Sequence, residues 1–177
     1  MSEDLRLKLD RIADYEATIR PGVLTRLLRR VGTSAWFAAA YRNLGQVLDP
    51  QVAKIQDGAV LAKVYGLPTL IMVSTGAKSG QPRTSPLLYL RAGVDMLVVG
   101  TNFGQPRHPG WTANLLAHPR ATVTIGGIEI EVTAALLDDV ERALEFPRFV
   151  NLYPGYANYL ERRRGLEPRM FRLRPVG

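Results

Sequence analysis

Three segments of the chain concentrate side chains that could bind or transform a small molecule. In the first, Thr75–Arg83, two glycines stand among cationic and hydroxyl-bearing residues. Glycine lets the backbone approach an anion closely, and ammonium, guanidinium and hydroxyl groups donate hydrogen bonds to it. The segment therefore predicts an anion-binding loop, although a charged surface hairpin fits the spacing equally well. Its candidate ligand-binding residues are Lys78, Ser79, Gly80 and Arg83.

The second segment, Gly100–Asn114, follows an apolar run and is dense in glycine, proline, polar and aromatic residues. Such a segment after a buried strand is typical of the wall of a ligand site. Taken alone, His108 is more typical of a surface histidine and Trp111 of a core residue. His118 lies where a helix should end, which suits a structural role.

The third segment carries Tyr153, Tyr156 and Tyr159, three of the seven tyrosines in the chain. If a helix begins after Gly155, Tyr156 and Tyr159 share a face. Phenols offer flat apolar walls and a hydroxyl that can orient a carbonyl or deliver a proton. Equally, the three tyrosines could form an aromatic latch, that is, a purely structural cluster that anchors a terminal helix.

Several short strands must position these segments. Apolar runs at Thr69–Ser74, Leu87–Leu90 and Met96–Val99 predict buried antiparallel strands, and Ala92–Asp95 predicts a hairpin turn. Two further strands flank Gly126 and Gly127, and in the second of them Ile128, Ile130 and Val132 alternate with polar residues. A helix follows Asp138 through about Phe149, and Met170–Arg174 is expected to be an edge strand. We therefore expect an α+β fold with a barrel of about six antiparallel strands.

Residues 1–65 are predicted to form a helical extension, and residues 66–177 the barrel domain. The leucines among the charges of the first twelve residues predict a frayed helix, which Arg20–Gly22 breaks. Val23–Val31 reads as a basic amphipathic helix, and another helix follows Ser34. A basic amphipathic helix can lie on an anionic membrane surface, although a cover for one side of the barrel is the favoured interpretation.

Composition narrows the chemistry. The 177 residues include no cysteine and two histidines, so disulfides, thiolate nucleophiles and three-histidine metal sites are excluded and no metal is expected. The net charge of +7 suggests an anionic partner, but the arginines are not interleaved with strand aromatics as in nucleic-acid-binding proteins. We expect no nucleic-acid partner. No apolar segment is long enough to span a bilayer, the charged start does not resemble a signal peptide, and a cytoplasmic location is expected.

The order and spacing of the three segments resemble the deazaflavin-dependent nitroreductase family, which uses coenzyme F420. The shared marks are the Thr75–Arg83 loop with Pro86 and Leu87 after it, the turn from Pro109 to Leu115, and the spacing from Tyr153 to Tyr159. The resemblance covers roughly residues 66–174. It implies a split β-barrel that resembles FMN-binding barrels, and hydride transfer from reduced F420 to a quinone, a conjugated enone or a nitro-heteroaromatic.

The resemblance also implies roles for individual residues. Lys78, Ser79 and Arg83 would hold the phosphate and acidic tail of the cofactor. The residues implied around the cofactor as a whole are Lys78, Ser79, Gly80, Arg83, Pro86, Val99, Gly100, Asn102, Phe103, Arg107, Pro109, Trp111 and Asn114. Those implied for catalysis are Tyr153, Tyr156, Tyr159 and Thr101.

Asn102 and Phe103 replace a Lys-Gly pair that many family members carry. One cationic contact is thereby lost, for which Arg107 could compensate, and Phe103 could reshape the substrate mouth. Two alternatives stay open: an FMN-dependent split-barrel reductase, and a non-catalytic protein that binds a cofactor or a membrane. A homodimer and a peripheral membrane contact through the N-terminal helices are further expectations.

Overall fold

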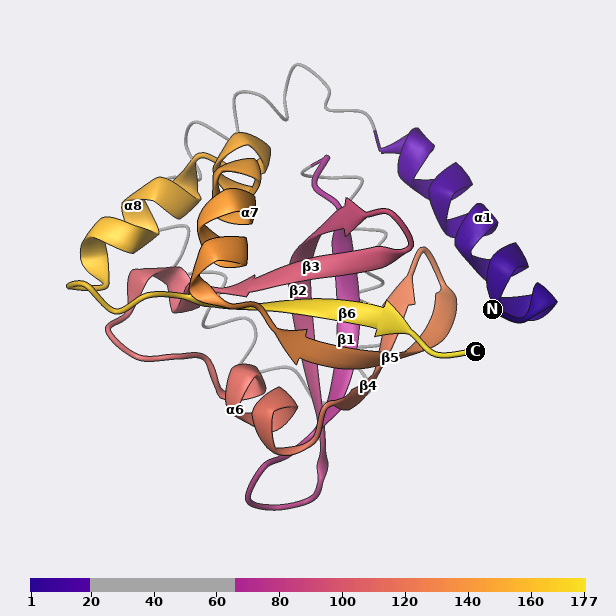
Figure 1. The fold of residues 1–177 in the computed structure, drawn as a ribbon, viewed down its shortest axis with the longest axis horizontal. Helices are drawn as coiled ribbons and strands as arrows, with labels where there is room; N and C mark the ends of the chain where they lie inside the picture. The colour runs from indigo at the N-terminus through magenta and orange to yellow at the C-terminus, as the bar shows by residue number, and fades with distance from the viewer. Residues whose placement is uncertain (20–65) are drawn as a thin grey trace.

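The structure is a computed structural model that describes residues 1–19 and 66–177 (Figure 1). The predicted break at Arg20–Gly22, the amphipathic helix at Val23–Val31 and the helix after Ser34 lie outside these residues. Within the described part, no helix is both long enough and apolar enough to cross a membrane.

The described strands close into an antiparallel barrel in the order β1-β2-β3-β6-β5-β4, which confirms the α+β barrel. Both predicted hairpins are present, since β2 pairs with β3 across Gly93–Val94 and β4 pairs with β5 across Gly126–Gly127. The six strands are β1 (Thr69–Thr75), β2 (Pro82–Ala92), β3 (Asp95–Gly100), β4 (Arg120–Ile125), β5 (Ile128–Leu136) and β6 (Arg169–Pro175).

The prediction that Met170–Arg174 forms an edge strand is wrong. Strand β6 lies between β3 and β5, with Phe171 opposite Val98 and Leu173 opposite Ala134. Both partners are remote in sequence, so only the closure of the barrel reveals them. Closure also pairs β1 with β4 and leaves no edge in the sheet.

Helix α1 (Glu3–Thr18) is regular, so the expectation of a frayed helix is wrong. The hydroxyl of Ser2 caps it by accepting a hydrogen bond from the Leu5 amide. Leu5, Leu9 and Ile12 are buried in the same core cluster as the interior of the barrel, at a spacing that places them on one helix face. Packing against the barrel therefore stabilises a helix whose charges alone suggested fraying.

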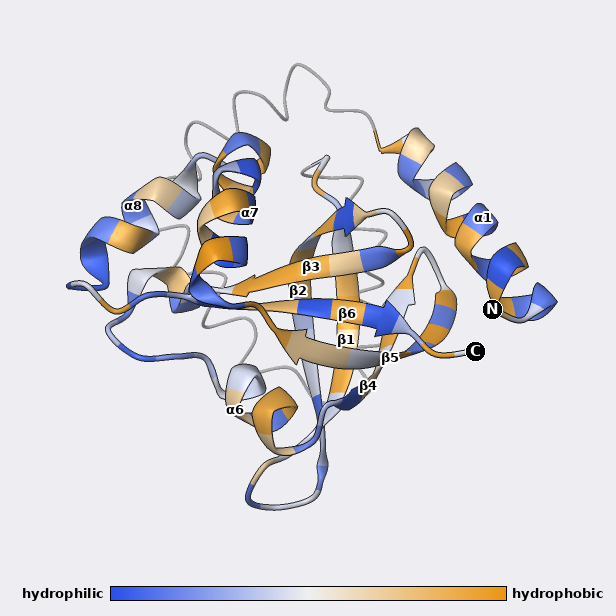
Figure 2. Ribbon diagram, in the orientation of Figure 1, coloured by the Kyte–Doolittle hydropathy of each residue, from blue (hydrophilic) through white to orange (hydrophobic). Residues whose placement is uncertain are grey.

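Strand β3 is buried on both faces and separates two cores. Met96 and Val98 belong to the barrel interior, whereas Leu97 and Val99 belong to a second cluster with side chains of the two helices after β5. Figure 2 shows β3 coloured largely as hydrophobic, with those two helices beside it. The helices around the barrel are η1 (Asn102–Gly104), α6 (Gly110–Ala117), α7 (Asp139–Leu152) and α8 (Gly155–Arg162).

Local signals fix where these helices begin. The Asp138 carboxylate accepts from the Glu141 amide at 2.8 Å, and Glu141 in turn accepts from the Asp138 amide, which forms the capping box at the start of α7. His118 is the C-cap of α6, as expected. Helix α8 begins at Gly155, where a Cβ would lie 2.4 Å from the Tyr153 ring.

Candidate active site

The turn between β1 and β2 is tight and well braced; we call Gly76–Arg83 the cationic loop. The Gly76 amide donates to the Gln81 carbonyl, and the Gly80 amide donates to the Gly76 carbonyl, each at 2.8 Å. A Cβ on Gly76 would lie 2.7 Å from the Ser79 hydroxyl oxygen. A side chain at position 76 would therefore displace the Ser79 hydroxyl, and it would also lie 3.0 Å from the Gln81 carbonyl oxygen.

Asn114 of α6 joins the cationic loop to the second predicted segment. Its Oδ1 accepts from the Ala77 amide at 3.0 Å, and its Nδ2 donates to the Ser74 hydroxyl at 3.2 Å. These contacts lie 37 and 40 residues apart in sequence. The family motif pointed to Asn114, but not to this bracing contact.

The cationic loop presents charge to solvent. Lys78, Ser79 and Arg83 are exposed, and neither cation has an ion-pair partner within residues 1–19 and 66–177. The Ser79 hydroxyl oxygen accepts from the Gln81 amide, which leaves its proton available to a ligand. Pro86 is half-buried on β2 opposite Ile71, next to this donor set in the sequence.

Strand β3 ends where α6 approaches it closely. A Cβ on Gly100 would lie 2.7 Å from a Thr112 methyl group and 3.1 Å from the Pro109 ring, so this position must be glycine. The Thr112 hydroxyl donates to the Pro109 carbonyl at 2.8 Å, within the first turn of the helix. The predicted residues Gly100 and Pro109 are thus in close contact, whereas Val99 belongs to the second core cluster.

After β3 the backbone enters an unusual turn; we call Asn102–Gly104 the left-handed turn. Its three residues have φ values of 49°, 54° and 81°. Two of them, Asn102 and Phe103, are not glycine. Asparagine tolerates this region, but a bulky residue such as phenylalanine is strained in it. Such strain persists only where surrounding contacts over-determine the conformation, and it occurs often at functional sites.

Those contacts come from Arg163, a residue that the sequence reasoning missed. Arg163 is 1% exposed, and its guanidinium donates to the Thr101 carbonyl at 2.7 Å. Weaker bonds reach the carbonyls of Gln105 and Arg107 at 3.3 and 3.4 Å. Three arginines stand in a row at 162–164, so nothing in the sequence indicated that the middle one is buried.

The three tyrosines of the third segment gather as predicted; we call Tyr153, Tyr156 and Tyr159 the tyrosine cluster. Their ring centroids lie 5.7 to 6.3 Å apart, and each side chain is buried. Burial raises the pKa of Tyr153 and Tyr159 above the ordinary value of 10.0. A hydrogen bond between these two phenols raises the pKa of Tyr153 further and opposes the rise for Tyr159, so Tyr153 is the donor.

The tyrosine cluster adjoins the left-handed turn. The rings of Phe103 and Tyr159 meet edge to face with centroids 6.1 Å apart. A Cβ on Gly104 would lie 3.2 Å from the Tyr159 Cα, which requires glycine there. The second predicted segment therefore contacts both others: Asn114 binds the cationic loop, and Phe103 and Gly104 contact the tyrosine cluster.

Three other predicted residues, and His108, have definite places. Trp111 is 8% exposed and belongs to the barrel core, where its ring centroid lies 5.7 Å from that of Phe171, so only its small exposed part can border a ligand. Thr101 is buried, and Arg107 is exposed with its Nε bonded to the Gln105 side chain. The pKa of His108 lies below its ordinary value of 6.5 because of burial and the charges of Arg169 and Arg163.

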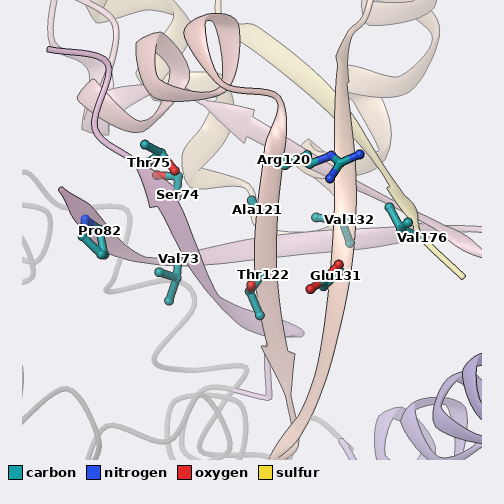
Figure 3. A pocket seen from close by; sticks show the side chains of 10 residues that line it. All are labelled: Val73, Ser74, Thr75, Pro82, Arg120, Ala121, Thr122, Glu131, Val132 and Val176. Carbon is teal, nitrogen blue, oxygen red and sulfur yellow. The ribbon is translucent and has the colours of Figure 1, made fainter. Parts of the chain in front are cut away.

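A hollow of about 280 Å³ lies over β1, β4 and β5 (Figure 3). It touches the base of the cationic loop through Ser74, Thr75 and Pro82, while Arg120 and Glu131 line it from the other side. The tyrosine cluster does not line it. The residues around it are Val73, Ser74, Thr75, Pro82, Arg120, Ala121, Thr122, Glu131, Val132 and Val176.

Comparison with known proteins bears on this arrangement. A family model described as F420H(2)-dependent quinone reductase matches residues 49–166. An F420H(2)-dependent quinone reductase of Mycobacterium tuberculosis (strain ATCC 25618 / H37Rv) is 45% identical over 79 residues, which cover 44% of this chain and 53% of the relative. The chain thus spans about half the length of the curated relatives it matches.

Two solved structures are similar to this chain in sequence and fold. One, described as the F420-H2 dependent reductase FDR-A, has 33% identity and a TM-score of 0.54 over 60% of this chain and 93% of that one. The other, described as a domain-swapped dimer, has 29% identity and a TM-score of 0.56 over 70% of this chain and 93% of that one. Both alignments cover nearly the whole of the solved chain.

Proposed function

The chain belongs to the F420H(2)-dependent quinone reductase family, and we propose that it is an oxidoreductase that reduces a quinone with coenzyme F420H2. The observation that carries the proposal is the family match over residues 49–166, which spans all three candidate segments. Conjugated enones and nitro-heteroaromatics, which share the electron-poor character of quinones, are further candidate acceptors.

The cationic loop fits the anionic part of such a cofactor. Lys78 and Arg83 lack carboxylate partners within the described residues, and Ser79 has a free hydroxyl proton. Phosphate and carboxylate groups prefer this combination of ammonium, guanidinium and hydroxyl donors. We therefore assign Lys78, Ser79, Gly80 and Arg83 to the cofactor tail, with Asn114 holding the loop in place.

Reduced F420, when bound, supplies a hydride from its deazaflavin ring. The protein's part is to bind the two reactants in contact and to keep water out. We assign the border of the ring to the end of β3 and its surroundings. The residues assigned there are Pro86, Val99, Gly100, Thr101, Asn102, Phe103, Arg107, Pro109 and Trp111.

The tyrosine cluster supplies the acceptor side. Because the pKa values of Tyr153 and Tyr159 are raised, both phenols are protonated at neutral pH. Tyr153 donates its hydrogen bond to Tyr159, so the Tyr159 proton is available to an oxygen of the acceptor as negative charge develops there. Tyr156 packs against both rings and completes the apolar wall, and Thr101 is a second candidate donor.

We further propose a cytoplasmic homodimer with peripheral membrane contact through Val23–Val31. The dimer is supported by a similar solved structure that is described as a domain-swapped dimer, and the membrane contact by the basic amphipathic pattern of that segment. Light scattering of the purified protein tests the dimer, and vesicle sedimentation at two salt concentrations tests the membrane contact.

The activity itself is tested by incubating the purified chain with F420H2 and a water-soluble naphthoquinone. We expect the quinone to be consumed together with F420H2 in equal amounts, because each hydride transfer oxidises one cofactor. A parallel reaction with reduced FMN tests the alternative of an FMN-dependent reductase. Turnover with reduced FMN but not with F420H2 would show that FMN is the cofactor. Turnover with neither would refute the proposed reductase activity.

A further inference from the structure

Arg163 makes more polar contacts with the loop between β3 and α6 than any other described side chain. We propose that Arg163 is a positioning residue that holds this loop in the conformation presenting Thr101, Asn102 and Phe103 to the reactants. The proposal rests on the function proposed above, but its structural part can be tested without any cofactor.

The contacts of Arg163 use the whole guanidinium group. Nε donates to the Leu166 carbonyl at 2.8 Å, and Nη2 donates to the Glu167 carbonyl at 3.4 Å. Nη1 donates to the carbonyls of the β3–α6 loop, most closely to that of Thr101. These acceptors are backbone carbonyls, so Arg163 acts as a multidentate clamp between two stretches of chain. Lysine, whose donors all sit on one atom, cannot reproduce this reach.

The place where the clamp acts is informative. The carbonyls of Thr101 and Gln105 stand immediately before and after the left-handed turn. Because Phe103 is strained there, the turn needs contacts that hold both its ends. Arg163 provides these contacts. The left-handed turn then places the Phe103 ring against Tyr159. Loss of the Arg163 contacts should therefore displace both the loop that borders the deazaflavin ring and the Phe103 ring beside the tyrosine cluster.

His108 offers a readout of the clamp that does not depend on activity. Its Nδ1 lies 3.4 Å from Nη2 of Arg163, which as a permanent donor places the imidazole proton on Nε2. The charged groups that face the ring are Arg163 and Arg169, and both oppose its protonation. The pKa of His108 can be followed by NMR through the signals of its imidazole ring. Since the chain has only two histidines, these signals can be assigned by comparison with a His108→Gln variant.

The test uses two variants of Arg163. Arg163→Met removes the charge and the hydrogen-bond donors, whereas Arg163→Lys keeps the charge but loses the planar guanidinium group with its spread donors. Exposed Arg164, replaced by glutamine, is the matched control from the same run of arginines. In both Arg163 variants we expect hydride transfer in a single turnover to slow at least about tenfold, because small misplacements of reacting groups have effects of that order. The affinity for F420H2 should fall less than the rate, because the cationic loop, which is assigned to the cofactor tail, does not contact Arg163.

The His108 signal should report the same loss. In Arg163→Met the pKa of His108 should rise toward its ordinary value, while Arg164→Gln should leave both the titration and the rate unchanged. Wild-type rates in folded Arg163→Lys and Arg163→Met would overturn the proposal. Parallel losses of rate and F420H2 affinity would also overturn it, since they indicate a general structural defect. If Arg163→Met does not fold, Arg163→Lys decides by the same criteria.

The failure of the proposed function would look different. If the wild-type protein neither binds nor oxidises F420H2, the function is wrong whatever the variants do. The amide signals of residues 101–108 and the His108 titration would then still report whether Arg163 holds the loop. Unchanged signals in both Arg163 variants would refute the clamp itself.

Discussion

The phenol of Tyr89, on β2, donates a 2.5 Å hydrogen bond to a carboxylate oxygen of Glu16, on α1. Tyr89 is fully buried, and Nε of Arg91 lies 3.7 Å from the other Glu16 oxygen. Burial, and then the bond to Glu16, raises the pKa of Tyr89 well above its ordinary range. A polar contact thus fastens the N-terminal helix to the barrel in addition to its apolar face.

This contact predicts coupled stability losses. Tyr89→Phe and Glu16→Gln should each lower the free energy of unfolding by about 1.5–3 kcal/mol, because hydrogen bonds to charged groups contribute that much. Urea denaturation measures the effect, and the double variant should lose less than the sum of the two single losses. Leu7→Ala, at a side chain that is 60% exposed on α1, should change little. Strictly additive losses would show that the two residues do not interact.

Asn114→Ala should loosen the cationic loop without unfolding the barrel. The variant loses the acceptor for the Ala77 amide and the donor to Ser74. We expect the dissociation constant for F420 to rise roughly tenfold, equivalent to the loss of about one or two hydrogen bonds. Calorimetric titration measures it, with exposed Asn151→Ala on α7 as control. Wild-type affinity in Asn114→Ala would mean that the loop is pre-formed without this brace.

Lys78→Ala and Arg83→Ala should weaken F420 binding directly. Each variant removes a charge-assisted bond of about 1.5–3 kcal/mol, so affinity should fall roughly ten- to hundredfold. Because the contacts are exposed and ionic, wild-type affinity should also fall with added salt. Lys8→Ala, on α1, provides a control of equal charge change. If both loop variants bind as the wild type does, the cofactor tail lies elsewhere.

Tyr153→Phe and Tyr159→Phe should separate chemistry from binding. Each change removes a hydroxyl but keeps an aromatic ring in the cluster, so the packing is preserved. We expect kcat to fall about 10²-fold, the lower range for loss of a proton donor, with F420 affinity within about twofold. Steady-state kinetics and titration together measure this split. Equal losses of turnover and affinity would make the tyrosine cluster an aromatic latch.

The lowered pKa of His108 predicts how stability depends on pH. The folded state binds the imidazole proton less readily than the unfolded state, whose pKa is near the ordinary value of 6.5. This contribution to stability is therefore complete above about pH 6.5 and is lost as the pH falls through the lower folded value. Urea denaturation from pH 8 to 5 should show it, and His108→Gln should flatten the curve. An identical pH dependence in His108→Gln and wild type would contradict this.

Much of the fold could be predicted because its signals are local. Gly126–Gly127 marks a two-residue turn, the alternation from Ile128 to Val132 marks a strand, and Asp138 with Glu141 marks a helix start. The spacing of the tyrosines also placed them together. Each of these signals depends on residues only a few positions apart.

The features that could not be predicted depend on contacts between distant residues. The position of β6 follows from pairing with β3 and β5, and the regularity of α1 from its burial against the barrel. The left-handed conformation of Phe103 runs against its intrinsic preference and is held by Arg163, 60 positions further along the chain. Binding of Asn114 to the cationic loop is likewise invisible in the sequence.

Titration of the purified wild-type chain with F420, with FMN in parallel, tests the central claim most directly. Calorimetry is the suitable method, because it does not depend on contact between the cofactor and the largely buried Trp111. We predict saturable F420 binding at micromolar or lower concentration that weakens in Lys78→Ala and in added salt, and little binding of FMN. Tighter binding of FMN, or binding of neither cofactor, would contradict the account.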